Sequence, residues 1–451
     1  MVDLATILAG FGDAFTLYNL AFVLLGVTLG QMVGAVPGIG PIMAMAIAIP
    51  FTFGLDSLPA IAFLVGVNKG GLVGGAVPAV LMNTPGTPDA AATALDGHPL
   101  AKQGKPLKAT KMALFSSITG DTFSDIVLIT VSAPLAILAL KMGPIEVAAL
   151  MIFAFSILAG LIGNSLTKGV IAAAFGVLVA SVGQDPEHYT PRLIFGYWDV
   201  FDGLPLPAVA IGMLAMSEIL HRMPLAHGGV QSAIETNDTG NPDDRRVTWA
   251  EYWSCRFTLL RGATIGTILG AMPGIGSTAA AFMSYAMTKA SSKEPETFGK
   301  GNIQGIAASE SANSAVVGSN LIPLLTLGIP GSPTTAILLG GMVIWGLEPG
   351  PLLFVEHKEF VWGLIASLYV SNVLLLVLNL PLIRGWARLL RVSRSLLFAA
   401  VLGFATLGVY SLNNNLFDVA VVYVLGVMAF FMRRYGVPLA PTVLGVVLGP
   451  L

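Results

Sequence analysis

The residues of this sequence that could bind a charged solute lie in a pattern that occurs twice. G-x-x-x-G-A-x-P-G-I-G covers residues 30–40 and again residues 266–276, and seven of its eleven positions are identical. Proline removes a backbone donor and glycine permits unusual dihedral angles, so both copies predict a break in a helix. At a break, helix amino-termini can point positive partial charge at a carboxylate, and freed carbonyls can hold a cation. A plain packing kink is the alternative; the duplication favours a substrate site that includes Gly38, Gly40, Gly274, Gly276 and Ser277.

A second pair of matching stretches lies at residues 68–88 and 313–333, with Asn, Pro, Pro-Gly and a final Pro in register. Amide side chains donate hydrogen bonds to carboxylates and coordinate cations, and hydroxyl groups at a Pro-Gly turn suit contacts at the tip of a hairpin. Ordinary turn chemistry is the alternative for the turn residues. The candidate substrate contacts in these stretches are Asn68, Asn83, Thr84, Gly86, Thr87, Asn313, Gly331 and Ser332.

Charged side chains inside apolar sequence are further candidates. Lys69 is a lone cation in such sequence, so we include it as a partner for an anionic substrate, with snorkelling to an interface as the alternative. Glu310 could bind sodium or carry a proton, or it could cap a helix start. Asp121 and Asp125 are four residues apart and share one helical face. They could relay protons, or they could be partnered structural acids. The candidate cation-coupling residues are Asn68, Glu310, Asn313 and Ser314.

The composition indicates a membrane protein. Of 451 residues, 55% are apolar and only 11% are charged, against roughly 25% charged residues in soluble domains. A net charge of −2 without a long basic tract argues against nucleic acid as a partner, and lipid is the expected environment. The single cysteine, Cys255, excludes an internal disulfide, and the histidines fall in loops or at helix ends. We expect no metal and no cofactor other than a coupling ion, Na⁺ or H⁺.

The elements that must position these residues are membrane helices. We expect an all-α polytopic membrane protein of about 10–12 membrane segments, with two inverted-topology repeats and broken helices or re-entrant hairpins. Residues 98–111 form a basic loop and residues 348–359 an acidic one at equivalent places, so the orientation signals have opposite sign. Residues 70–88 predict a helical hairpin that enters the membrane without crossing it, and residues 305–327 predict a second broken segment.

The predicted organisation has five parts. They are a first repeat with its hairpin (1–111), connecting transmembrane helices (112–222), a polar inter-repeat loop (223–255), a second repeat with its hairpin (256–360), and C-terminal transmembrane helices (361–451). The polar loop lacks an apolar period, as is typical of surface segments.

Several of these motifs together resemble one known family. The sequence is similar over nearly its whole length to the large membrane subunit of the tripartite tricarboxylate transporters, the TctA-type permeases. The resemblance rests on Pro-Gly-Ile-Gly at 37–40 and 273–276, Asn-Thr-Pro-Gly at 83–86, Ala-Leu-Asp-Gly at 94–97, Lys-Met-Gly-Pro at 141–144 with Glu146, Glu-Ser-Ala-Asn at 310–313, Leu-Gly-Ile-Pro-Gly-Ser at 327–332 and Pro-Gly-Pro at 349–351.

The resemblance implies a multi-pass permease of the bacterial inner membrane. Its partners would be a small four-helix membrane subunit and a periplasmic solute-binding protein. It would import tricarboxylates, dicarboxylates or related organic acids by symport with sodium or protons rather than with ATP. The absence of a G-x-x-x-x-G-K-[ST] phosphate loop agrees with this.

Two other functions are alternatives to transport. An anion channel would use the same broken helices but would conduct without a binding protein. A polytopic membrane enzyme would need a convergent nucleophile and base, and neither His-Glu-x-x-His nor Gly-x-Ser-x-Gly occurs, so no enzyme activity is expected. For the mechanism we favour an elevator-like alternating access, in which one unit holding both hairpins moves against a scaffold.

Overall fold

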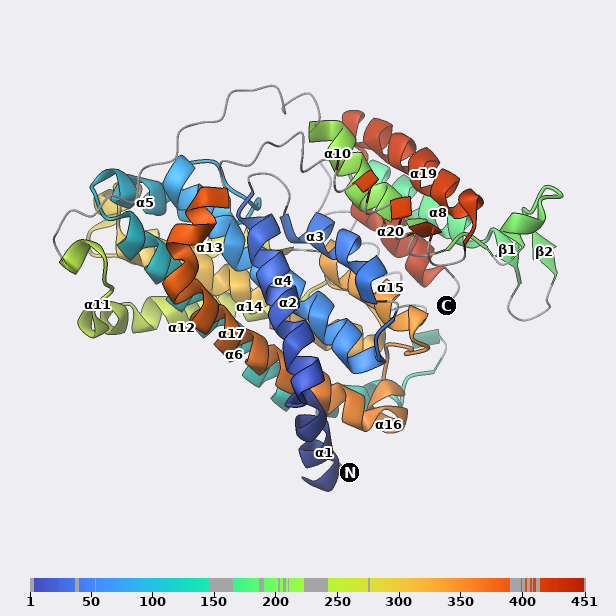
Figure 1. The fold of residues 1–451 in the computed structure, drawn as a ribbon, viewed down its shortest axis with the longest axis horizontal. Coiled ribbons are helices and arrows are strands. Elements are labelled where there is room, and N and C mark those ends of the chain that lie inside the picture. The colour runs from blue at the N-terminus through green and yellow to red at the C-terminus, as the bar shows by residue number, and fades with distance from the viewer. Residues whose placement is uncertain are drawn as a thin grey trace.

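The fold of the chain is given by a computed structural model. The structure describes residues 4–36, 40–52, 54–143, 165–185, 190–201, 203–205, 211–222, 242–274, 276–389 and 414–449, and a few residues between these ranges. As expected for an all-α polytopic membrane protein, the described residues are mostly helical (Figure 1). One short antiparallel hairpin, which the sequence analysis did not include, joins β1 (Gly183–Gln184) to β2 (Pro191–Arg192).

The first repeat begins with a helical hairpin packed on a long helix. Its elements are α2 (Leu17–Gly34), α3 (Gly40–Ala48), α4 (Ser57–Met82) and α5 (Ala90–Lys102). A Cβ atom at Gly30 would lie 2.2 Å from the carbonyl oxygen of Val67, and one at Gly34 would lie 2.1 Å from that of Gly71, so only glycine permits this approach. Because both contacts advance in the same direction, α2 and α4 are parallel. The chain therefore reverses between Gly34 and Gly40, where the sequence predicted a break.

The second repeat is built in the same way. Its elements are α12 (Arg256–Ala271), α13 (Gly276–Ala290), α14 (Ile303–Leu327) and α15 (Pro333–Ile344). A Cβ atom at Gly266 would lie 2.1 Å from the carbonyl oxygen of Ala312, and one at Gly270 would lie 3.0 Å from that of Val316. In the register of the sequence repeat, these are the same four positions that join α2 to α4. The duplicated sequence therefore produces duplicated packing.

The long helices α4 and α14 are continuous, although the Gly and Pro residues within them predicted breaks. α4 runs unbroken for 26 residues to Met82, which corrects the expected break at its glycines, and it is long and apolar enough to cross a membrane. α14 is unbroken over 25 residues, which corrects the second expected break. Pro78 and Pro323 lie close to the helix ends, so little of the backbone ladder follows them. Both helices then end in a left-handed cap, with φ 53° at Asn83 and 71° at Gly328.

The helix α6 (Pro106–Ala139) lies against α4 and runs antiparallel to it. Asp125, in the middle of α6, pairs with Lys69 of α4. Leu114, nearer the start of α6, lines a small cavity together with Val77, nearer the end of α4. Residue numbers therefore rise along one helix as they fall along the other.

The same helix runs parallel to α14. A Cβ atom at Gly120 would lie 2.1 Å from the carbonyl oxygen of Ser311, and one at Gly318 would lie 2.5 Å from Oδ1 of Asp125. Since α6 is antiparallel to α4 and parallel to α14, these two equivalent helices run in opposite directions. α6 is thus the shared partner of both repeats.

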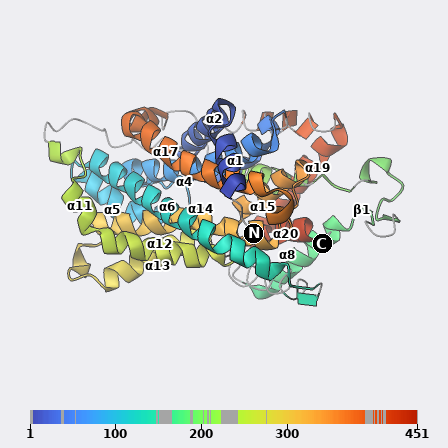
Figure 2. The same ribbon diagram turned by 90° about the horizontal axis from the view of Figure 1, so that it is seen from below.

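The remaining helices surround this centre or form the far end of the molecule. They are α1 (Leu4–Ala14), α8 (Leu166–Ala180), α10 (Ser217–Arg222), α11 (Trp249–Ser254), α16 (Leu353–Glu356), α17 (Lys358–Leu389), α19 (Leu416–Arg434) and α20 (Leu439–Leu448), with short 3₁₀ or π turns at 49–52, 198–200, 211–216, 242–244 and 295–297. Figures 1 and 2 show α8, α19 and α20 at one end and α5 and α11 at the other.

Five of the described helices are long and apolar enough to cross a membrane. They are Leu17–Gly34, Ser57–Met82, Pro106–Ala139, Lys358–Leu382 and Leu416–Arg434. Large apolar side chains such as Leu25, Phe257 and Val424 are exposed on the outside, where lipid would cover them. Much of the predicted connecting helices, at residues 144–164, and of the predicted C-terminal helices, at residues 390–413, lies outside the described residues.

The junction between the repeats is polar and partly helical. Residues 223–241 lie outside the described residues, and α11 follows them with a reciprocal cap between Thr248 and Glu251. The expected basic loop at residues 98–111 is largely helical, and its Lys108 pairs with Glu251. Burial acts to raise the pKa of the Glu251 carboxyl, but the hydrogen bonds from Lys108 and Thr248 outweigh it and hold the pKa below its usual range.

Candidate functional site

The turn that follows α4 meets the hairpin of the second repeat at Asp89. Thr87 Oγ1 donates to Asp89 Oδ2 at 3.1 Å, and Ser277 Oγ donates to Asp89 Oδ1 at 3.2 Å. Asn313 of α14 also lies beside Asp89. The carboxylate directly precedes α5, where the partial charge of the helix favours an anion. This contact brings together three predicted site residues, Thr87, Ser277 and Asn313, from both repeats.

A second carboxylate, Glu310 of α14, belongs to the same site. Thr93 Oγ1 of α5 donates to Glu310 Oε1, and Ser117 Oγ of α6 donates to Glu310 Oε2 at 2.7 Å. Asp89 is close enough to Glu310 for the two charges to repel each other. In the described part of the chain, neither carboxylate forms an ion pair with a lysine or arginine. Two buried carboxylates without a cation attract a metal cation or a proton.

Several buried polar atoms without partners lie close to Glu310 in the sequence of α14. One more lies on α4, at the position equivalent to Asn313 in the repeat. The Ser314 hydroxyl and the Asn68 Oδ1 have no hydrogen-bond partner among the described residues, and the Asn313 amide, which lies beside Asp89, makes no hydrogen bond of full geometry. Lipid cannot satisfy such groups, and each one costs roughly 1–3 kcal/mol when it is left unpaired. The arrangement can therefore bind a small polar solute or cation. All three residues were predicted from the sequence as cation-coupling candidates.

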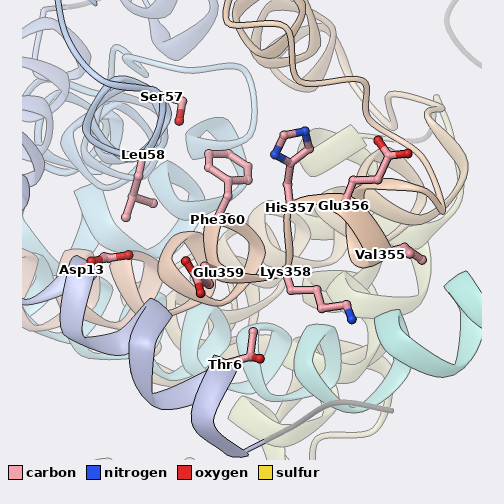
Figure 3. Close-up of a pocket in the computed structure, with 10 residues that line it drawn as sticks. All are labelled: Thr6, Asp13, Ser57, Leu58, Val355, Glu356, His357, Lys358, Glu359 and Phe360. Carbon is pink, nitrogen blue, oxygen red and sulfur yellow. The ribbon is translucent and has the colours of Figure 1, made fainter.

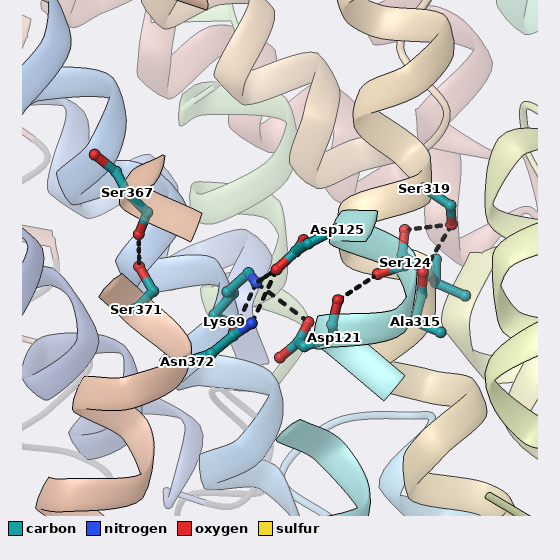
Figure 4. A network of polar contacts seen from close by, with 10 residues as sticks. Lys69, Asp121, Ser124, Asp125, Ala315, Ser319, Ser367, Ser371 and Asn372 are labelled. Carbon is teal, nitrogen blue, oxygen red and sulfur yellow. Dashed lines mark hydrogen bonds and ion pairs between the residues drawn. The ribbon is translucent and has the colours of Figure 1, made fainter. Parts of the chain in front are cut away.

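Lys69 lies in a separate buried cluster that α4, α6 and α17 form (Figure 4). Its Nζ donates to Asp125 Oδ2 and to Asn372 Oδ1, both at 2.8 Å, and lies 3.6 Å from Asp121 Oδ1. Asn372 Nδ2 also donates to Asp125 Oδ2, at 2.9 Å. Lys69 is fully buried, so it does not snorkel to an interface. Asp121 and Asp125 are its partners, which agrees with the interpretation of these residues as structural acids.

The Pro-Gly turns fold back on the hairpin tips in both repeats. Gly86 N–H donates to the carbonyl of Gly75 at 3.2 Å, and a Cβ atom at Gly86 would lie 2.3 Å from the Gly34 carbonyl oxygen. In the second repeat, Gly274 N–H donates to the carbonyl of Gly331 at 2.9 Å. The backbone donors of Gly86 and Gly274 are therefore used within the protein, and these glycines allow the turns to lie close to the tips.

The other predicted site residues have more local roles or are not described. Gly38 lies outside the described residues. Gly40 and Gly276, the counterparts that begin α3 and α13, have φ values of 66° and 72°. Ser332 caps α15 through a reciprocal contact with Thr335. Asn83 is exposed at the end of α4, and the Thr84 hydroxyl donates to the carbonyl of Met82 at 3.2 Å.

Sequence reasoning missed several buried polar residues in and around the site, and Asp96, which holds α5 in place, is the clearest example. Asp96 Oδ1 accepts hydrogen bonds from the backbone N–H groups of Gly299, Gly301 and Asn302, and its Oδ2 accepts one from Tyr285. This carboxylate ties α5 to the loop that precedes α14. Its place in Ala-Leu-Asp-Gly was noted only as a family motif. Asp89, Thr93 and Ser117 were also missed; Asp89 directly follows the predicted turn, which was an available signal.

One described cavity lies elsewhere. It has a volume of about 530 Å³ and is lined by Thr6, Asp13, Ser57, Leu58 and residues 355–360 (Figure 3). Ser57 begins α4, whereas the turn that carries Asp89 follows the end of the same 26-residue helix. The cavity is therefore separated from the buried carboxylates by most of the length of α4.

The chain as a whole is similar to known proteins. Residues 20–444 match the family described as "Tripartite tricarboxylate transporter TctA family". An uncharacterized 52.8 kDa protein in the TAR-I ttuC' 3' region of Agrobacterium vitis is 36% identical over all of this chain and 89% of that relative. An uncharacterized protein in the TAR-II ttuC' 3' region of the same organism is 45% identical over 41% of this chain and 77% of that relative. No solved structure matches the chain.

Proposed function

Because the chain belongs to the tripartite tricarboxylate transporter TctA family, we propose that it is the large permease subunit of a binding-protein-dependent secondary transporter. It imports tricarboxylates or related organic acids together with Na⁺ or H⁺. The observation that carries the proposal is the meeting of Thr87 and Asp89 from the first repeat with Ser277, Glu310 and Asn313 from the second. Paired repeats that meet at a polar site in apolar surroundings are the architecture of secondary transporters.

The opposite directions of α4 and α14 support an inverted relation between the two repeats. In a membrane, equivalent helices of inverted repeats point to opposite sides. The basic residues that follow the first turn and the acidic residues that follow the second agree with this orientation.

Cysteine labelling from the two sides of the membrane tests the inverted topology. Cys255 is buried and is first replaced to give a background without cysteines. Lys105→Cys and Glu356→Cys, in separate proteins, are expected to react with an impermeant reagent from opposite sides. Reaction of both from the same side would rule out inverted repeats.

We assign the carboxylates to the coupling cation rather than to the substrate. Asp89 and Glu310, with the unpartnered groups of Asn313, Ser314 and Asn68, offer oxygen ligands that suit Na⁺, and the carboxylates alone suit H⁺. A bound cation would then make this anionic region attractive to an organic acid, which links the two binding events. The carboxylates of the substrate bind instead to polar groups at the hairpin tips and Pro-Gly turns, such as Asn83, Thr84 and Ser332.

The proposed partners are a small membrane subunit, a periplasmic solute-binding protein and the surrounding lipid. The complex would lie in the bacterial inner membrane, where the periplasmic protein delivers the organic acid. The family is one of tripartite transporters, and this supports a requirement for the other two subunits.

Uptake measurements with the complete transporter test the function. Vesicles that contain the chain and its two partner subunits are given a sodium or proton gradient, and entry of radiolabelled tricarboxylates and dicarboxylates is followed. Glu310→Gln is expected to lose accumulation driven by the gradient, since it removes a charge that holds the cation. Glu251→Gln, a change to a surface carboxylate outside the site, serves as the control. Full gradient-driven accumulation by Glu310→Gln would contradict the assignment.

A further inference from the structure

The register of the repeat places Lys69 of α4 at the position of Ser314 in α14. Asn68 and Asn313 precede them in the two copies. Lys69 is fully buried and hydrogen-bonded, whereas the hydroxyl of Ser314 is buried and has no partner among the described residues. One helix therefore carries a positive charge at the point where its counterpart carries an unpartnered oxygen.

The surroundings of these two positions contain the same kinds of group. Around Lys69 are two carboxylates, Asp121 and Asp125, and the amide of Asn372. Near Ser314 on α14 are the Glu310 carboxylate, which interacts with Asp89, and the amide of Asn313. Glu310 precedes Ser314 by four residues, so both lie on one face of α14. The difference is the cation, which only the first cluster contains within the described residues.

The formal charges of the two clusters also differ by one positive charge. With every group ionised, the two carboxylates and one ammonium group of the first cluster sum to −1. The two carboxylates of the second cluster sum to −2, and one monovalent cation brings this cluster also to −1. Buried charge of one sign is costly unless it is paired, so both clusters need a positive charge at this place.

We propose that Lys69 of α4 is a tethered cation, which takes the place of the mobile monovalent cation that is bound beside α14, at Asp89 and Glu310. The chain then has one site for a mobile cation instead of two. The inference rests on the proposed function, because it gives the second cluster the coupling ion. Lys69 is not a substrate contact, since its ammonium group is directed to Asp125, Asn372 and Asp121.

The test counts bound sodium in the purified full chain with its small membrane subunit. Equilibrium binding of ²²Na⁺ is measured at alkaline pH, where protons do not compete for carboxylates. The wild type is expected to bind one ion per chain. Lys69→Ser, which gives the first repeat the residue of the second, is expected to bind two. Combining Lys69→Ser with Asp125→Asn is expected to return the count to one, because a carboxylate of the new site is removed.

Glu310→Gln separates the two clusters. Alone it is expected to abolish sodium binding, and together with Lys69→Ser it is expected to leave one ion, held in the first repeat. The reciprocal change, Ser314→Lys, adds a tether beside Glu310 and is expected to release the bound sodium. Gel filtration shows which variants are folded, and Ser314→Lys tests the inference if Lys69→Ser does not fold.

The inference and the proposed function fail in different ways. A wild type that binds one ion and a folded Lys69→Ser variant that also binds one would overturn the tethered cation and leave the coupling site intact. A wild type that binds no sodium would contradict a sodium site at Asp89 and Glu310 and would leave only protons as the coupling ion. In that case a gain of one ion by Lys69→Ser still supports the tether, and no gain overturns it.

Discussion

The two repeats share their packing and differ in their electrostatics. Glycines of α2 and α12 pack closely against the backbone at equivalent positions of α4 and α14, so the two helix pairs are packed in the same way. Lys69 of the first repeat pairs with the buried carboxylates of α6, whereas Glu310 of the second repeat, with Asp89 of the first, is held by hydroxyl groups. A Cβ atom at these glycines would collide with backbone, which cannot move aside, so both repeats need glycine there. The buried charges differ between the two clusters, and only the cluster around Lys69 contains its own cation within the described residues.

The largest expected effect tests the paired cluster. Asp125→Asn leaves the Lys69 ammonium without its hydrogen-bonded carboxylate, so we expect a loss of roughly 3–5 kcal/mol in the free energy of unfolding. Asp121→Asn is the matched control and should cost less, because Asp121 lies 3.6 Å from the ammonium, too far for a hydrogen bond. Thermal unfolding in detergent measures both. Equal losses would show that the two carboxylates contribute alike.

The next prediction concerns the packing that both repeats share. Gly30→Val and Gly266→Val each place a Cβ atom about 2 Å from a backbone carbonyl oxygen, and we expect each to lower the free energy of unfolding by about 1–3 kcal/mol or more. Gly12→Ala on α1, where no atom lies within 4 Å, should be neutral or slightly stabilising. Unfolding by heat or denaturant gives the comparison. A tolerated valine at one position and not at the other would break the equivalence of the repeats.

A smaller effect of opposite sign is expected in the unpaired cluster. Glu310→Gln removes a charge that has no cationic partner within the described residues, so without sodium the protein should be unchanged or more stable by about 1 kcal/mol. Sodium should then raise the melting temperature of the wild type and not that of the variant. If Glu310→Gln were as destabilising as Asp125→Asn, the contrast between the clusters would be lost.

The smallest effect lies outside both repeats, at Glu251. Its carboxyl has a lowered pKa in the folded protein because hydrogen bonds from Lys108 and Thr248 outweigh burial. Its contribution to stability is therefore fully present above the unfolded pKa of about 4.3 and is lost as the pH falls through the lower folded value. The difference in melting temperature between the wild type and Glu251→Gln should shrink in that range. A difference that stays constant with pH would contradict the assignment.

The sequence by itself determined the membrane class, the duplication and the positions of the hairpin tips. Apolar composition leaves a long helix no stable place except lipid or a protein core. Proline and glycine at residues 37–40 and 273–276 act locally, so the ends of α2 and α12 followed from the residues themselves. Asn313, Ser277 and Thr87 could be selected because the repeat marks equivalent positions.

Only the tertiary structure decided how the same residue types are used. The glycines of α4 predicted a helix break from the sequence. In the structure α4 is continuous, because the backbone of α2 packs into the space that side chains at these glycines would occupy. Lys69 and Asp125 are 56 residues apart, and their pairing depends on the antiparallel packing of α4 and α6. Asp89 and Glu310 meet because the turn of one repeat reaches α14 of the other. Contacts between distant segments depend on how the helices pack, and a local sequence pattern does not predict that packing.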